Sequence, residues 1–141
     1  MDKKRWGLTA VIVAVVVTML EAIFHGLFLK ETYATTASIW RPMTDMNRLM
    51  PLGWFSTLIT SFIVVYIFHR GYEGKRSPLA EGLRFGLTIG LLTAIPMSVW
   101  TYIMWPVSLF LAVAWFVIAM IDMLVAGMII GVMYKRSSME G

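Results

Sequence analysis

The chain has 141 residues, of which 59% are hydrophobic and only 14% are charged, whereas about 25% of the residues in a typical soluble domain are charged. With a mean hydropathy of +0.76, this composition excludes a water-soluble globule. The sequence has no cysteine, which excludes disulfides, thiolate metal sites and cysteine nucleophiles. Twelve basic and eight acidic residues leave a net charge of +4, and the length suits one domain, residues 1–141.

Four apolar stretches are long enough to cross a membrane, which takes about 20 residues of helix. They cover approximately residues 6–29, 49–68, 83–105 and 107–134. None shows strand-like alternation, so the sequence predicts an all-α membrane protein, a bundle of four transmembrane helices. The first apolar run is longer than the core of a signal peptide and has no convincing cleavage site after it, so we expect a retained helix.

The basic residues are distributed unequally over the ends of these spans. Nine lie before the first span, between the second and third, or after the fourth: Lys3, Lys4, Arg5, Arg70, Lys75, Arg76, Arg84, Lys135 and Arg136. Only Lys30, Arg41 and Arg48 lie on the other side. The positive-inside rule therefore predicts that both termini are cytoplasmic in a bacterial inner membrane. Charges dispersed over three short segments also argue against a nucleic-acid partner.

Small residues recur at every fourth position in two spans, which puts them on one face of each helix. The third span carries Gly82, Gly86, Gly90, Ala94 and Ser98, and the first carries Ala10, Ala14, Thr18, Ala22 and Gly26. Such stripes let transmembrane helices approach closely, either within one chain or between copies in a homo-oligomer. Pro96 interrupts the backbone hydrogen bonds of the third span and predicts a kink there.

Three ionisable residues lie inside the spans: Glu21, His25 and Asp122. A charged group at the bilayer centre costs at least about 2.5–3.5 kcal/mol. We therefore expect these residues to have a structural or functional role that offsets this cost. Glu21 and His25 are four residues apart and share a helix face. From the helix rise, we expect a ladder from Asp122 through Glu21 to His25 with steps of about 6–8 Å. It serves either as a proton or cation path or as neutral hydrogen-bonding groups between helices.

No cofactor or enzymatic motif is expected. A di-iron bundle site needs four carboxylates and two Glu-x-x-His pairs, and a bis-histidine haem needs two histidines at one depth. His25 and His69 are about 25 Å or more apart by helix rise. Met43, Met46 and Met50 form a short cluster of thioethers, which suit Cu(I), although anchoring at the membrane interface explains them as well. No catalytic triad spacing, phosphate loop or zinc-protease motif is present.

Several short segments carry a family resemblance: His25 with Gly26, then Tyr33, then Trp40, Arg41 and Pro42, and the run Gly-Leu-Arg-Phe-Gly at 82–86. Through these segments the chain resembles small four-helix bacterial inner-membrane proteins of uncharacterised function. The resemblance covers most of the chain and implies fold and location only.

The sequence favours a non-enzymatic function. We expect a structural or accessory subunit that packs against itself as a homo-oligomer or against other membrane subunits. The alternative is a small proton or cation transporter or channel component that uses Glu21, His25 and Asp122.

Overall fold

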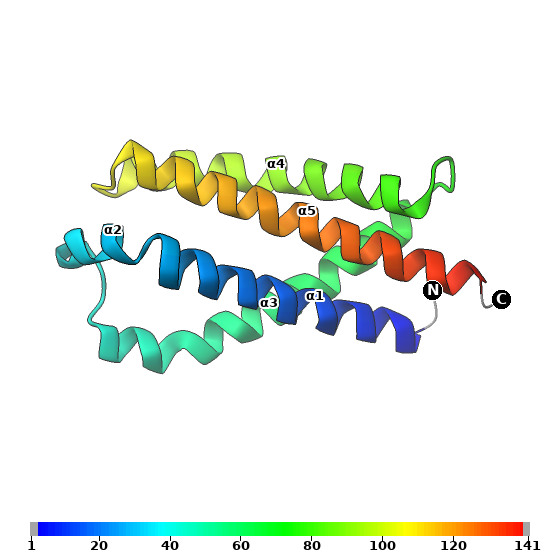
Figure 1. Cartoon of the computed structure of the whole chain (residues 1–141), viewed down its shortest axis with the longest axis horizontal. Coiled ribbons are helices and arrows are strands. Elements are labelled where there is room, and N and C mark those ends of the chain that lie inside the picture. Colours follow the sequence, from blue (N-terminus) through cyan, green and yellow to red (C-terminus); the bar gives the residue numbers. More distant parts are fainter. Residues whose placement is uncertain (1–2, 140–141) are drawn as a thin grey trace.

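The computed structural model describes residues 3–139, and the side chains of residues 3–134. Over this part of the chain every regular element is a helix (Figure 1). The four long helices are α1 (Lys3–Ile23), α3 (Met43–Gly71), α4 (Pro78–Met104) and α5 (Leu109–Met139). Three short helices follow α1: the π-helix η1 (Phe24–Phe28), α2 (Lys30–Thr35) and the 3-10 helix η2 (Ala37–Ile39).

Four helical segments are long and apolar enough to cross a membrane, namely Lys3–Phe28, Met43–Gly71, Pro78–Met104 and Leu109–Tyr134. The predicted number and order of spans therefore agree with the structure of a multi-pass membrane protein. The helix of the second span, α3, begins at Met43 rather than near residue 49, because its first turns are polar and are not part of the apolar run. The connection between the first and second spans is correspondingly shorter and is itself mostly helical.

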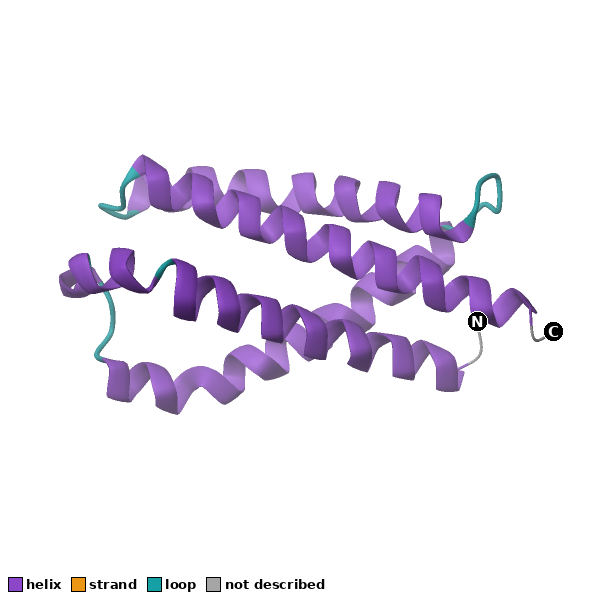
Figure 2. Ribbon diagram, viewed as in Figure 1, coloured by secondary structure: helices purple, strands orange, loops and turns teal. Residues whose placement is uncertain are grey.

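The helices form two pairs. α4 and α5 lie antiparallel and pack along their length, while α1 packs against both α3 and α5 (Figure 1). The start of α1, the connection between α3 and α4 and the end of α5 lie at one end of the molecule, which is called the inner end below (Figure 2). The side chains of Lys135 and Arg136, which belong to the predicted basic end, lie outside the described residues. α2, η2 and the turn between α4 and α5 lie at the opposite end, which is called the outer end below.

The small-residue stripe of α4 lies in its contact with α5. All five of its members are buried: Gly82, Gly86, Gly90, Ala94 and Ser98. A Cβ atom on Gly86 would overlap the backbone carbonyl of Met123, so the two backbones touch there. Pro96 lies inside α4, and the helix continues through it to Met104.

The stripe of α1 is only partly used within the chain. Ala10 and Ala14 are buried and Thr18 is half-buried, but Ala22 and Gly26 are exposed. A Cβ atom on Gly26 would meet nothing within 4 Å. The structure departs from the predicted stripe here, because α1 gives way to the π-helical turn of η1 and its outer face no longer lies against a neighbouring helix.

Two separate apolar cores hold the bundle together. The inner core consists of Ala10, Val13, Val17, Val64, Val65, Phe68, Ala126 and Ile130, from α1, α3 and α5. The outer core consists of Leu29, Val107, Leu111 and Ile118, with Tyr33, Trp40 and Trp115 packed against it. The candidate site lies along the bundle between these two cores.

Candidate functional site

A cavity of about 450 Å³ lies among all four long helices. Its ionisable lining residues are Glu21, His25 and Asp122, the three that the sequence singled out. The rest of its polar lining consists of hydroxyl groups on α3 and α4: Ser56, Thr57, Thr60, Ser61, Thr93 and Thr101. The cavity is therefore a mainly apolar chamber that contains one small cluster of ionisable groups and a set of hydroxyls.

Glu21 and His25 are in direct contact. The Nε2 atom of His25 lies 2.9 Å from Oε2 of Glu21, across one helical turn. The predicted shared face of these two residues is therefore present, even though His25 belongs to the π-helix η1 and Glu21 to α1. A π-helical turn holds one more residue than an α-helical turn and is frequent at functional sites.

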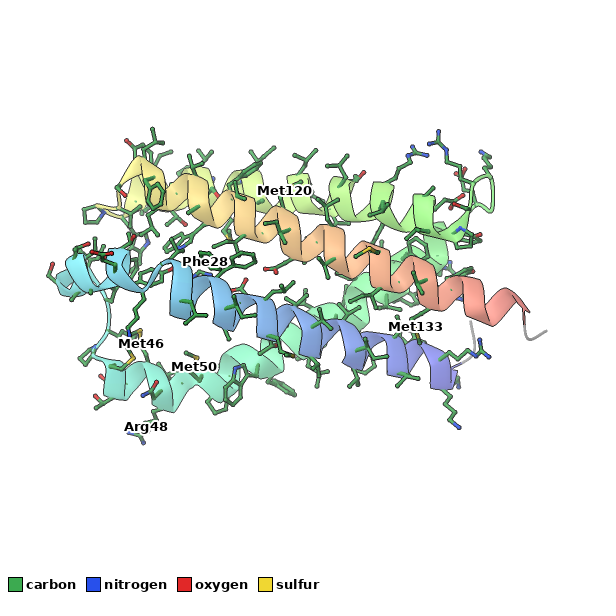
Figure 3. All side chains as sticks on the ribbon, in the orientation of Figure 1. Phe28, Met46, Arg48, Met50, Met120 and Met133 are labelled. Carbon is green, nitrogen blue, oxygen red and sulfur yellow. The ribbon has the colours of Figure 1, made fainter. Side chains whose placement is uncertain are left out.

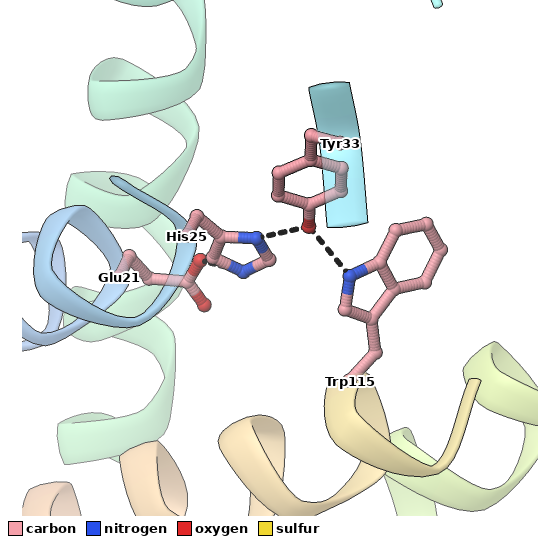
Figure 4. Close-up of polar contacts among 4 residues, drawn as sticks. All are labelled: Glu21, His25, Tyr33 and Trp115. Carbon is pink, nitrogen blue, oxygen red and sulfur yellow. Dashed lines mark hydrogen bonds and ion pairs between the residues drawn. The ribbon is translucent and has the colours of Figure 1, made fainter. Parts of the chain in front are cut away.

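The other ring nitrogen of His25 is held by a residue that the sequence argument did not include. Nδ1 of His25 lies 2.5 Å from the hydroxyl of Tyr33 on α2, and that hydroxyl accepts a hydrogen bond of 2.7 Å from Nε1 of Trp115 on α5 (Figure 4). An indole N–H can only donate, so the Tyr33 O–H is free to donate to Nδ1 of a neutral imidazole. The Nε2–H of His25 then donates to Glu21, and the chain of hydrogen bonds runs in one direction from Trp115 to Glu21.

Asp122 completes the cluster. Its exposed fraction is only 2%, and its carboxyl group is within hydrogen-bonding range of the carboxyl group of Glu21. Two carboxyl groups can share a hydrogen bond only when one of them carries a proton. The Oδ1 atom of Asp122 is buried and has no hydrogen-bond partner among the described residues. In the expected ladder, the step from His25 to Glu21 is thus a direct contact of 2.9 Å.

Tyr33 is suited to act as a neutral link. Burial raises the pKa of its phenol above the usual 10.0, and the negative charge of Glu21 acts in the same direction, while the hydrogen bond from Trp115 opposes them. The hydroxyl therefore stays protonated at neutral pH. In that form it can accept from Trp115 and donate to His25 at the same time.

The cavity opens between α3 and α4. Among its lining residues, Val13 and Asp122 on α1 and α5 are buried, whereas Ser56, Thr60 and Thr93 on α3 and α4 are exposed. The rings of Phe68 and Phe85 bridge α3 and α4 near the inner end, with centroids 5.4 Å apart. The opening is thus a lateral one, on the apolar flank of the bundle.

The other candidate sites lie apart from this cluster. The ring of His69 packs against Tyr134, 6.1 Å between centroids, near the inner end of the bundle, whereas His25 stacks on Tyr33 at the outer end. Met46 and Met50 lie on the first turns of α3 (Figure 3), and the neighbouring Met43 is 64% exposed. Among the described residues, no group of three or more His, Cys, Asp and Glu side chains is placed to hold a metal ion.

Trp115 and Tyr33 are the functional candidates that sequence reasoning missed. Trp115 precedes Asp122 by seven residues, which puts both on one face of a helix, and this spacing was a usable signal. The approach of Tyr33 to His25 had no such signal, because it depends on the turn that joins η1 to α2.

Comparison of the chain with models of protein families, with curated proteins and with solved structures finds no match.

Proposed function

We propose that this chain is a multi-pass protein of the bacterial inner membrane, with both termini in the cytoplasm, that moves protons or small cations across it. The basic residues support this orientation, since nine of the twelve lie near the chain ends or near the connection between α3 and α4. The beginning of α1 and the end of α5 lie at the same end of the bundle, as four spans require (Figure 1).

The observation that carries the proposal is the contact of two carboxyl groups and an imidazole inside one cavity. Ionisable groups inside a membrane are costly and mark ion pathways and proton relays. Here Glu21 contacts His25 and lies within hydrogen-bonding range of Asp122, and the cavity gives all three access to a ligand. Groups that served only to join helices would gain nothing from facing an open chamber.

In this mechanism the proton is loaded onto the carboxyl pair, which is Glu21 and Asp122. A proton held between Glu21 and Asp122 leaves when a cation enters or when the pair meets the aqueous phase on the other side. His25 is a positioning residue whose Nε2–H donates to Glu21, and Tyr33 and Trp115 hold its ring in place. No covalent step is required, so the proposed function is non-enzymatic.

Proton flux into proteoliposomes tests the proposal. Glu21→Gln and Asp122→Asn keep the size and hydrogen-bonding capacity of each side chain but cannot load a proton. We expect each variant to fold but to show no proton flux. The double variant should lose no more flux than either single variant, because both substitutions break the same pathway. The matched control is Asp45→Asn, an exposed acid on the first turn of α3 outside the cavity. Wild-type vesicles without flux at neutral and acidic pH, with folded protein, would rule out transport.

One observation favours a second function, that of an accessory subunit or homo-oligomer. Ala22 and Gly26 are the two members of the first small-residue stripe that the chain itself leaves exposed, and small residues let helices of separate chains approach. Native mass spectrometry of the purified protein tests it. Gly26→Leu should convert an oligomer to a monomer, whereas Gly53→Leu, on an open part of α3, should not.

A further inference from the structure

We infer that the cavity binds an amphiphilic organic cation, a primary ammonium attached to an apolar group, with Asp122 and Glu21 as its counter-charges. This inference rests on the proposed function and names the class of molecule that the site takes. It is carried by the size of the cavity, the sign of its charges, the unpaired oxygen of Asp122 and the side on which the cavity opens.

The size of the cavity argues for a molecule rather than a bare ion. A volume of about 450 Å³ falls in the range of about 300–1,000 Å³ that is typical of small-molecule pockets. A single proton or metal ion would leave nearly all of this space empty. The described residues also lack a cluster of metal-ligating side chains.

The charges of the lining select a cation. No lysine or arginine lines the cavity, and its ionisable residues are Glu21 and His25 from α1 and η1 and Asp122 from α5, while α3 and α4 contribute hydroxyls and apolar groups. Tyr33 on α2 faces this cluster through the ring of His25. An anionic ligand would meet two carboxyl groups and no fixed positive charge, which is unfavourable in an environment of low dielectric constant.

The unpaired oxygen of Asp122 identifies the ligand's polar group. Oδ1 of Asp122 is buried without a partner, and a buried acceptor left unpaired costs about 1–3 kcal/mol. An ammonium group supplies N–H donors and a countercharge at once, which makes the hydrogen bond a strong one. The hydroxyl of Thr93 and the indole of Trp115 line the same cavity, and an indole face attracts cations as well.

The lateral opening suits a ligand with an apolar part. The exposed lining residues Ser56, Thr60 and Thr93 belong to the two helices that flank the opening. Apolar side chains, among them Val17, Ile118 and Met123, line the interior. An amphiphile dissolved in the bilayer can therefore enter from the side, with its ammonium group directed at the carboxyl pair and its apolar group against these side chains.

Binding exchanges one cation for one proton. With a single proton between Glu21 and Asp122 the pair carries one negative charge. When the ammonium enters and that proton leaves, the total charge of the site and its ligand is unchanged. Binding should therefore release one proton per ligand and strengthen about tenfold for each unit by which the pH rises.

Three ligands that share one frame test this inference on the full-length protein in detergent. They are 4-phenylbutylammonium, its neutral analogue 4-phenylbutanol and its anionic analogue 4-phenylbutanoate, titrated calorimetrically with a pH-indicator dye in weakly buffered solution. We expect the ammonium to bind with release of one proton and the other two to bind at least about tenfold more weakly. Asp122→Asn should remove both binding and proton release, and Asp45→Asn should change neither.

Each outcome of the test decides one statement. Equal affinity for the alcohol, or tighter binding of the carboxylate, overturns the cationic class. Absence of binding by all three ligands, in a protein whose proton flux depends on Glu21, overturns the inference and leaves the proposed function standing. Absence of both binding and flux removes both. If Asp122→Asn fails to fold, the pH dependence and proton release of the wild-type protein decide the matter.

Discussion

Gly82 of α4 and Gly127 of α5 are packed so closely that a Cβ atom added to either one would overlap the backbone carbonyl oxygen of the other. Gly131 meets the start of α4 in a similar way, against the carbonyl of Pro78. The two backbones therefore touch at these positions, as small residues permit in membrane bundles.

The contact predicts that Gly82→Ala and Gly127→Ala each lower the free energy of unfolding by about 1–3 kcal/mol, since a methyl group must push the helices apart. The double variant should cost less than the sum of the two, because both methyl groups relieve their overlap by the same separation. Thermal unfolding in detergent measures this.

Gly53→Ala is the matched control for these glycine variants. A Cβ atom at Gly53 meets nothing within 4 Å inside α3, so alanine should stabilise the helix by about 0.5–1 kcal/mol. A loss of stability at Gly53 equal to that at Gly82 would mean that close approach of the backbones is not the cause.

Tyr33→Phe should loosen the attachment of α2 without removing the carboxyl pair. The change deletes the hydroxyl that joins Nδ1 of His25 to Nε1 of Trp115, and each half-buried group loses a hydrogen bond worth about 0.5–1.5 kcal/mol. We expect faster amide exchange over α2 and slower proton flux that is not abolished. Flux equal to that of wild type would show that the position of the His25 ring does not matter.

The titration of Tyr33 gives a prediction for alkaline pH. Because burial raises its pKa above 10.0, the protonated phenol is favoured in the folded protein. Its contribution to stability is fully present below about pH 10 and is lost as the pH rises through the folded-state pKa. The difference between the ultraviolet titrations of wild type and Tyr33→Phe should therefore lie above pH 10. A difference centred below pH 10 would contradict the burial of this hydroxyl.

The orientation of the chain can be tested with a reporter that is active only in the cytoplasm. Fusion after Gly141, or insertion into the connection between α3 and α4, should give an active reporter. Insertion within residues 35–45 should not, because only three basic residues lie on that side. The opposite pattern would overturn the assignment based on charge.

The four long helices could be predicted because membrane spans are set by length and hydrophobicity. The pairing of Glu21 with His25 could be predicted because residues four apart are neighbours on a helix. The short separation between Glu21 and Asp122 could not, since helix rise gives depth along the bundle but not the distance between helices.

The outer end was harder to predict than the spans. Polar residues such as Thr44 and Asp45 favoured a loop before residue 49, yet they begin α3 directly after Pro42. Hydrophobicity does not distinguish the first turns of a long helix from a connection when both are polar. The exposed position of Ala22 likewise depends on where α1 leaves its neighbours, which a periodic pattern does not encode.

The position of Tyr33 in the site depends on the number of residues in the π-helical turn η1. The N–H of Leu29 donates to the carbonyl of Phe24, five residues earlier, rather than to that of His25. Deleting one residue from Phe24–Phe28 would let an ordinary α-helix close and would leave the following segment close to its present orientation, because five residues of a π-turn advance the helix about as far as four residues of an α-helix. Inserting one further residue could not be absorbed in this way, and everything after it would rotate by about 100° about the helix axis. The side chain of Tyr33 would then swing away from the imidazole. A single insertion there should therefore dismantle the cluster while leaving every one of its side chains in the sequence, and a single deletion should not.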